Sequence, residues 1–216
     1  RGRRQERNHR PGRGHGGLRQ VGACGASGGA RGQRRAVPRE GQRTAIAQDA
    51  RTILEKADSI RFPKESFQVE VTINSTTAGG AEFRKFRILS KGNENTIVQT
   101  VEPASERGQI LLMKARDLWV FLPEVSQPVR LSLAQRLTGQ VANGDLARAN
   151  FTGDYTPELL RSEKIEGADH HVLELKAVDR GVTYARVLFW VRASGNEPYK
   201  AEFYSLSDKH LKTTYY

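Results

Sequence analysis

The sequence predicts a mainly β (α+β) fold, in which one antiparallel sheet curls or closes on itself after an N-terminal helix. From Phe67 onward, apolar and polar residues alternate with a period of two, as in "FQVEVTIN", which is typical of half-buried strands. Short strands recur at roughly ten-residue spacing and are joined by tight polar turns. A sheet with that many strands must curl or close in order to bury one of its faces.

The first predicted element is a helix over residues 48–61, "QDARTILEKADSIR". Its apolar residues fall on one stripe at helical spacing, and Asp49 is of a type preferred at the N-cap. The helix is expected to end at Phe62-Pro63, because proline disfavours helical geometry in the residue before it. The apolar stripe consists of Ala50, Ile53, Leu54, Ala57 and Ile60.

The strands follow the helix along the rest of the chain. "KGNE" at residues 91–94 is a hairpin signal between two of them, and Glu166-Gly167 marks another tight turn. Strands are expected at 67–74, 83–90, 95–102, 108–114, 117–123, 128–133, 159–167, 170–178, 183–193, 198–207 and 209–216.

One segment, residues 134–158, does not alternate with a period of two. Two short helical pieces are expected there, at 134–140 and 143–150, with Asn143 or Asp145 capping the second. Long insertions without strands are usually functional. The segment is interpreted either as a short helical lid or as a surface excursion that plugs the end of the sheet.

The net charge of +11 comes almost entirely from the N-terminal region. Residues 1–46 hold twelve arginines and two acids, whereas the rest of the chain holds 23 basic and 22 acidic residues. The region has no Lys, Asp, Met, Phe, Tyr or Trp, so it cannot bury much apolar surface and is expected to be a disordered Arg/Gly-rich tail. A nearly neutral single domain is expected over residues 47–216.

Two interpretations of this tail remain open. It could bind nucleic-acid phosphates as an Arg/Gly arm. We favour a wrong-frame or remnant signal region, because GC-rich codons read in the wrong frame give Arg, Gly, Ala and Pro. Ala45-Ile46-Ala47 has the small-x-small pattern that signal peptidase cleaves, but no apolar run precedes it. For the same reason Cys24, in "VGACGAS", is not interpreted as a lipoprotein acylation site.

The predicted domain carries no recognisable catalytic or metal-binding motif. His170 and His171 are adjacent, so on a strand they point to opposite faces and cannot chelate one metal. The domain has no cysteine, which excludes disulfides and thiolate metal sites within it. Its charges balance, unlike those of a nucleic-acid-binding sheet. We therefore expect no enzymatic activity, no cofactor, no metal and no specific nucleic-acid partner.

The domain contains, in this order, "ARTILEKADSIRFP", "LWVFLPEVSQPVRL", "NGDLARANFTGDYTPELL" and "VLFWVRASGNEPYKAEFYSLSDKHLKT". In order and spacing, over about residues 48–213, these stretches resemble the LolA-like outer-membrane lipoprotein-sorting proteins of Gram-negative bacteria. Each motif alone is loose. The chain departs from the family at its N-terminus, which lacks the expected signal peptide, and at Tyr215-Tyr216.

The resemblance implies a LolA/LolB-like fold, a strongly curved, incomplete antiparallel β-barrel with helices over its open side and an apolar cavity between them. It implies a periplasmic carrier, expected to be a monomer, that shuttles the acyl chains of lipoproteins or another lipid toward the outer membrane. An inner-membrane transporter and an outer-membrane acceptor are the implied protein partners.

Candidate cavity residues follow from the alternation along the strands. Trp119 and Phe121 share one face of a strand that is apolar on both faces, as needed where one face meets the core and the other a cavity. The predicted cavity-lining residues are Val69, Val71, Ile88, Val98, Leu112, Trp119, Phe121, Leu173, Leu188, Trp190 and Phe203. The predicted lid residues are Leu137, Val141, Leu146 and Phe151.

Alternation does not tell which face of the sheet is the cavity, and each of these residues has ordinary core packing as its alternative. Two other functions also stay open. One is nucleic-acid binding through the basic tail, and the other is an accessory protein that uses the concave face for a protein partner.

Overall fold

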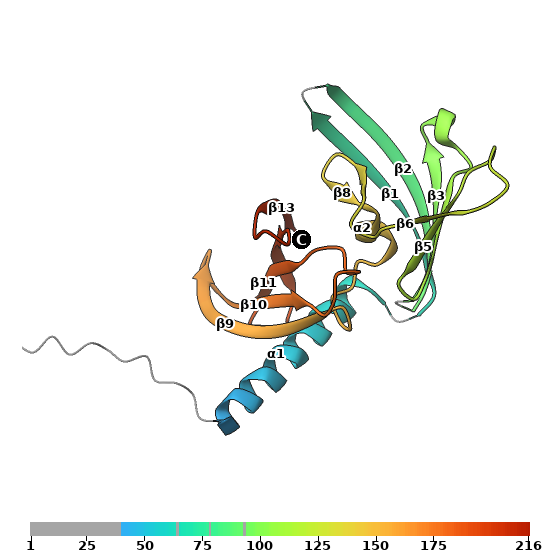
Figure 1. The fold of residues 1–216 in the computed structure, drawn as a ribbon. Coiled ribbons are helices and arrows are strands. Elements are labelled where there is room, and N and C mark those ends of the chain that lie inside the picture. The colour runs from blue at the N-terminus through green and yellow to red at the C-terminus, as the bar shows by residue number, and fades with distance from the viewer. Residues whose placement is uncertain (1–39, 64, 78, 93) are drawn as a thin grey trace, which may run out of the picture. The chain divides into compact units, whose positions relative to one another are not determined.

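Helix α1, Glu40–Arg61, is the first described element of the computed structural model, which describes residues 40–63, 65–77, 79–92 and 94–216 (Figure 1). The predicted helix over 48–61 is confirmed. Asp49 is not its N-cap, because the helix already begins at Glu40. Residues 1–39 of the predicted tail, which include Cys24, lie outside the described residues. Its last residues, 40–46, belong to α1.

The first half of the chain after α1 forms a six-stranded antiparallel sheet in which each strand pairs with the next in sequence. A short 3-10 helix, η1 (Ala104–Glu106), joins the third strand to the fourth. The strands are β1 (Phe67–Thr77), β2 (Gly80–Lys91), β3 (Asn95–Glu102), β4 (Ile110–Lys114), β5 (Asp117–Phe121) and β6 (Val129–Leu131).

The second half forms a five-stranded antiparallel sheet, again with neighbours in sequence side by side. Its strands are β9 (Tyr155–Ile165), β10 (Ala168–Ala177), β11 (Arg186–Arg192), β12 (Pro198–Tyr204) and β13 (His210–Tyr215). The mainly β architecture with an N-terminal helix is therefore confirmed. The prediction of one continuous sheet was wrong, because no ladder joins the two described sheets, and both stay open instead of closing into a barrel.

The insertion between the sheets forms β7 (Arg136–Thr138), β8 (Val141–Ala142) and α2 (Asn143–Ala147). The predicted helical piece at 134–140 is wrong, because this stretch forms one arm and the turn of a hairpin. Gly139 in that turn has φ +52°, and a Cβ there would lie 2.4 Å from Ser75 Oγ of β1, so the close approach of hairpin and sheet requires glycine.

The predicted second helical piece is confirmed as the short helix α2. Its N-cap is Ala142, so neither Asn143 nor Asp145 occupies that position. Asp145 still caps the helix from inside, because its carboxylate accepts a hydrogen bond from Ala142 N at 2.8 Å. Figure 1 shows α2 and β8 between the two sheets.

Two hydrophobic clusters form the core, one for each sheet. The first packs the buried face of α1 (Ala50, Leu54 and Ala57) against the five-stranded sheet. The second lies on the inner face of the six-stranded sheet, the face turned toward α2. The insertion and its flanks contribute to both, with Ala142 and Phe151 in the first cluster and Leu133 and Ala147 in the second.

Candidate functional site

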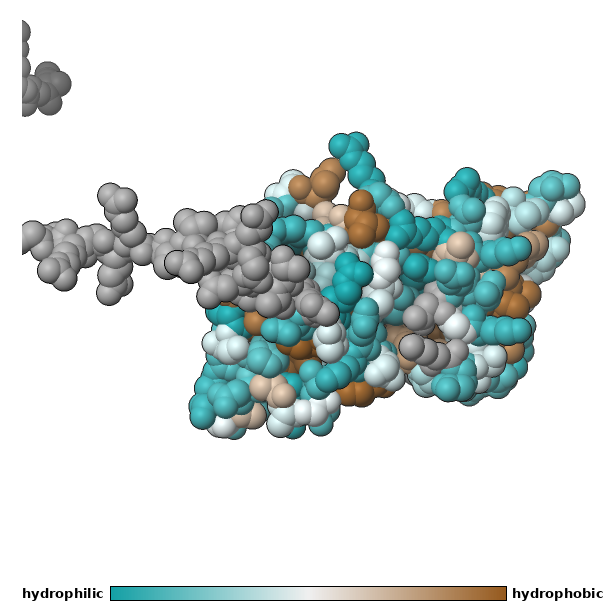
Figure 2. Space-filling view, turned by 90° about the horizontal axis from the view of Figure 1, so that it is seen from below, coloured by the Kyte–Doolittle hydropathy of each residue, from teal (hydrophilic) through white to brown (hydrophobic). Residues whose placement is uncertain are grey.

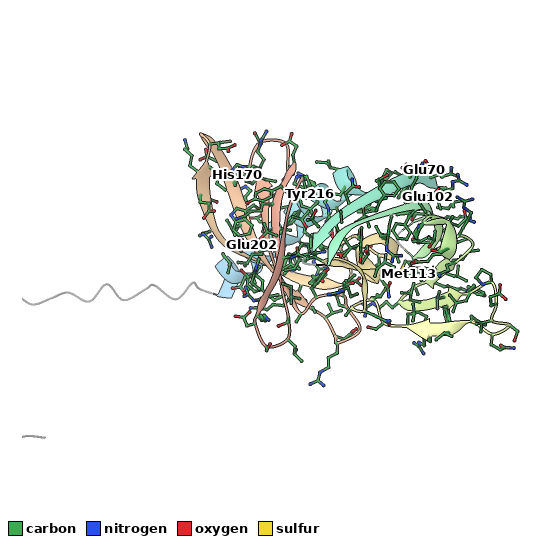
Figure 3. All side chains as sticks on the ribbon, turned by 90° about the horizontal axis from the view of Figure 1, so that it is seen from above. Glu70, Glu102, Met113, His170, Glu202 and Tyr216 are labelled. Atoms are coloured by element: carbon green, nitrogen blue, oxygen red, sulfur yellow. The ribbon has the colours of Figure 1, made fainter. Side chains whose placement is uncertain are left out.

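A cavity of about 450 Å³ is lined by both sheets and by the insertion. From the six-stranded sheet come Val71 and Ile73 of β1, and from the five-stranded sheet Phe203 of β12 with Lys212 and Thr214 of β13. Tyr216, which Figure 3 shows between the strands of the two sheets, also lines it. The two sheet edges that no ladder joins, β1 and β13, therefore face the same space.

Most of the cavity wall is apolar. β1 supplies its inner-face residues because side chains alternate along a strand, which turns Val71 and Ile73 toward the insertion and Thr72 away from it. The apolar lining residues are Phe62, Val71, Ile73, Val141, Leu146, Ala149, Phe151, Val182 and Phe203.

Asp145 of α2 is the centre of a small polar group in the wall. Its carboxylate accepts hydrogen bonds from Tyr184 Oη at 2.8 and 3.0 Å and forms an ion pair with Lys212 Nζ of β13. Burial, reinforced by the charge of Asp145, raises the pKa of Tyr184, so this hydroxyl stays protonated and remains a donor. These contacts tie α2 to the five-stranded sheet.

Arg61, at the end of α1, closes another side of the cavity. Its guanidinium lies 4.2 Å from the ring centroid of Phe151 and 4.9 Å from that of Tyr216. It donates hydrogen bonds to Ala149 O at 2.8 Å and to Asp58 Oδ1 at 3.1 Å. A cation thus forms part of the wall while its charge is compensated by Asp58 and by aromatic faces.

Asp58 anchors the end of the insertion to α1. Its Oδ2 accepts hydrogen bonds from Phe151 N at 2.8 Å, Thr152 N at 2.6 Å and Thr152 Oγ1 at 2.7 Å. Asp58 is only 5% exposed, so these donors supply the partners that a buried carboxylate needs.

An ion-pair network centred on the buried Asp154 connects the insertion to both sheets. Asp154, just before β9, forms ion pairs with Arg148, which follows α2, and with Arg116, in the turn between β4 and β5. Asp154 is 3% exposed, so removing either arginine would leave a buried carboxylate undercompensated. The insertion is therefore held at Asp58, Asp145 and Asp154.

The structure divides the predicted strand residues among four sheet faces. Only Val71 and Phe203 line the cavity. Ile88 and Val98 are buried in the second cluster, Val69 lies on the same inner face but is 42% exposed, and Leu173 is buried in the first cluster.

The other strand candidates lie on outer faces. Leu112, Trp119 and Phe121 are on the outer face of the six-stranded sheet, because Leu118 and Val120 take the inner positions of β5. Leu188 and Trp190 are on the outer face of the five-stranded sheet, opposite Phe189 and Val187 of the core. These five residues cannot share one cavity with Val71.

Three of the four predicted lid residues lie at the cavity. Val141, Leu146 and Phe151 line the cavity, whereas Leu137 packs against the second cluster. Sequence reasoning missed Arg61, Tyr155, Val182, Tyr184, Lys212 and Tyr216. Tyr184 was expected within a strand at 183–193, but β11 begins only at Arg186, and Tyr184 lies with Val182 in the preceding loop, which lines the cavity.

Other chemistry is scarce in the part of the chain that the structure describes. Residues 40–63, 65–77, 79–92 and 94–216 contain no group of three or more His, Cys, Asp or Glu side chains placed to hold a metal ion. Among the same residues, no helix is long and apolar enough to cross a membrane.

Comparison with known proteins places the chain in a family. A family model described only as an uncharacterized protein matches residues 92–216. The crystal structure of a LolA superfamily protein from Nitrosomonas europaea is 63% identical, with a TM-score of 0.74, and the match covers 77% of this chain and 76% of that one. No curated protein matches the sequence.

More distant structures share the fold. A domain described as an outer membrane lipoprotein-sorting protein domain, from Vibrio parahaemolyticus, is 22% identical with a TM-score of 0.65 and covers 77% of this chain and 76% of its own. A DUF1329 family protein from Desulfovibrio piger is 22% identical with a TM-score of 0.67, covering 79% and 78%. The identity to the Nitrosomonas protein and the coverage of both chains show that this chain belongs to the LolA superfamily.

Proposed function

We propose that the cavity holds the acyl chains of a lipoprotein or another lipid, and that the protein carries this cargo through the periplasm toward the outer membrane. The observation that carries the proposal is the mostly apolar cavity of about 450 Å³ lined by β1, β12, β13 and the insertion. A concave, mostly apolar space of this size is typical of small-molecule sites. No chemical step is needed, so the proposed carrier is not an enzyme.

Burial supplies the binding energy for such a cargo. Each methylene group moved from water into the cavity contributes about 0.8 kcal/mol, so roughly ten or more buried methylenes of an acyl chain are needed to outweigh the cost of association. The charged groups of the wall are paired: Asp145 with Lys212, Asp154 with Arg148, and Arg61 with Asp58. They therefore do not repel an apolar chain as uncompensated charges would.

The insertion is the proposed lid. It is fastened by hydrogen bonds and ion pairs at Asp58, Asp145 and Asp154, which can break and re-form, while Val141, Leu146 and Phe151 face the cavity. Loading and release then depend on differences in lipid affinity between the closed and open arrangements. An inner-membrane donor and an outer-membrane acceptor remain proposed partners.

The two alternative functions draw less support. A nucleic-acid arm would lie in the tail, outside the described residues as far as residue 39. A protein partner on the concave face would have to displace the insertion, since Ala147 and Leu146 of α2 pack against the inner-face cluster of the six-stranded sheet.

A filled-cavity variant tests the proposal. Val71→Trp places a large ring in the cavity, whereas Thr72→Trp, on the opposite face of the same strand, is its matched control. With a dansyl-labelled long-chain fatty acid and a lipidated peptide as probes, we expect Val71→Trp to weaken binding at least tenfold and Thr72→Trp to leave it unchanged. Equal binding by both variants, or no binding by the unaltered protein and no lipid in its mass spectrum, refutes the proposal.

A further inference from the structure

The outer face of the six-stranded sheet carries a continuous row of apolar residues. Cross-strand pairing sets Leu89 opposite Ile97, Ile97 opposite Leu112, and Leu112 opposite Trp119, from β2 to β5. Ile110 and Phe121 form the next pair on the same face. We call the six residues the outer patch: Leu89, Ile97, Ile110, Leu112, Trp119 and Phe121.

Half of the outer patch is exposed, and its other three residues, Ile110, Leu112 and Trp119, are half-buried. Phe121 is 39% exposed, Leu89 37% and Ile97 36%, whereas Leu118 and Met113 on the inner face are fully buried. Figure 2 shows hydrophobic atoms exposed at the end of the domain formed by the six-stranded sheet. Because the core lies on the other face, the patch is not needed to complete it, and contiguous exposed apolar patches mark interaction sites.

Basic residues surround the outer patch. Lys91 and Lys114 line the same shallow depression of about 550 Å³ as Leu89, Ile97 and Leu112, and neither lysine forms an ion pair with another described residue. Cations exceed acids around the patch. The cations are Lys85, Arg87, Lys91, Arg107, Lys114 and Arg130, and the acids are Glu70, Glu94, Glu102 and Asp117.

The paired charges lie at the other borders of the patch. Glu70 accepts from both Lys85 and Arg87, and these hydrogen bonds, that of Lys85 above all, hold the pKa of Glu70 below its usual range. Asp117 pairs with Arg130. The surplus positive charge is therefore concentrated at Lys91 and Lys114, beside the apolar depression.

We propose that the outer patch docks on an anionic lipid surface. Aromatic and aliphatic side chains enter the boundary between headgroups and acyl chains, where tryptophan is favoured. The stems of Lys91 and Lys114 extend along the apolar surface while their ammonium groups meet lipid phosphates. The surplus of positive charge disfavours a second copy of the same surface as the occupant. Docking goes beyond the proposed cargo binding and does not depend on it, because the patch and the cavity use opposite faces of the sheet.

Tryptophan fluorescence provides the first test, on the full-length chain. Trp190→Phe leaves Trp119 as the only tryptophan, and with phosphatidylcholine–phosphatidylglycerol vesicles brominated in their acyl chains we expect its emission to shift to the blue and to fall at least twofold. Trp119→Phe is the control. It leaves Trp190, which is 4% exposed on the other sheet, and its emission should stay unquenched.

Vesicle flotation provides the second test. Ile97→Ser with Phe121→Ser should weaken binding at least fivefold, whereas Leu206→Ser, at a residue that is 76% exposed in the β12–β13 turn, should leave it unchanged. Lys91→Glu with Lys114→Glu should weaken binding to anionic vesicles but not to phosphatidylcholine alone, with Lys209→Glu as the control. Circular dichroism confirms folding, and the lysine variants alter only exposed residues.

The arginine-rich residues 1–46 can bind anionic vesicles by charge alone. Flotation with an unquenched Trp119 therefore means that the tail alone binds, and overturns the proposal. A concentration-dependent dimer that Phe121→Ser abolishes, with vesicle binding intact, overturns it in favour of an interface between copies. Val71→Trp should leave vesicle binding unchanged. The docking proposal and the cargo proposal can therefore be refuted independently of each other.

Discussion

Each of the two sheets carries one tryptophan on its outer face, but the two tryptophans have different surroundings. On the five-stranded sheet, the ammonium of Lys200 lies 3.8 Å from the Trp190 ring centroid, and the indole donates a 2.6 Å hydrogen bond to Glu163. Val172 beside it is fully buried. On the six-stranded sheet, Trp119 lies in a row whose members Leu89 and Ile97 are exposed.

The difference shows that a strand with apolar residues on both faces need not leave one of them open. On the five-stranded sheet, the charged side chains of Lys200 and Glu163 cover Trp190, whereas Tyr215 on the same face is 70% exposed. On the six-stranded sheet, the nearest lysines, Lys91 and Lys114, lie at the end of the patch and leave Phe121 exposed. The cover is therefore local to Trp190, and no matching cation–indole contact accompanies the exposed row that contains Trp119 among the described residues.

The largest expected effect separates the two faces of one strand. Leu118→Ala removes a fully buried side chain from the inner face of β5 and should lower the free energy of unfolding by about 2–5 kcal/mol. Phe121 is on the outer face of the same strand and is 39% exposed, so Phe121→Ala should lower the free energy of unfolding by less than about 1.5 kcal/mol. Urea denaturation measures both values, and equal losses would mean that the outer face is also core.

A second change tests how the region between the sheets is fastened. Asp58→Ala leaves Phe151 N, Thr152 N and the Arg61 guanidinium without their shared acceptor. Unfolding free energy should fall by about 2–4 kcal/mol, since buried donors are left unpaired. Lys56→Ala, on an exposed position of the same helix, is the control. A loss no larger than in that control would mean that the cap contributes little.

Uncovering Trp190 would make the five-stranded sheet resemble the six-stranded one. Lys200→Ala removes the cation over the indole and should reduce stability by about 0.5–1 kcal/mol. Iodide quenching of Trp190, measured in a Trp119→Phe background, should increase. Unchanged quenching would show that residues other than Lys200 cover the ring.

The smallest effect concerns pH. The hydrogen bond from Trp190 Nε1, followed by that from Arg161, lowers the pKa of Glu163 from its usual 4.5. A lowered pKa means that the carboxylate's contribution is present above pH 4.5 and is lost as the pH falls through the lower folded value. The emission of Trp190 should therefore change below pH 4.5, and Glu163→Gln should abolish that titration. A titration that persists in the variant would assign it to another carboxylate.

The periodicity of the sequence predicted most strands and turns, but it predicted only in part which face of each sheet meets the core. The alternation in "FQVEVTIN" and the turn at Glu166-Gly167 correspond to β1 and to the β9–β10 hairpin. It also put Trp119 and Phe121 on one face, which the register confirms. It could not tell that this face points away from the core, because that depends on which side α2 packs.

The errors lie where contacts between distant residues decide the structure. Residues 134–140 have a composition that suits a helix, but Gly139 and its approach to Ser75 make a hairpin there. The bonds from Phe151 and Thr152 to Asp58 join segments about ninety residues apart, and no local pattern encodes them. Tyr184 and Lys212 are held in the cavity wall by contacts of this kind with Asp145.

The sharing of the insertion by both hydrophobic clusters has a kinetic consequence. Displacing it would withdraw Phe151 from one cluster and Ala147 from the other, so the open arrangement exposes apolar surface on both sheets at once. The proposed opening of the insertion would therefore give a sparsely populated state. The residence time of any molecule enclosed in the cavity is then limited by how often the protein opens, more than by how tightly the wall holds it.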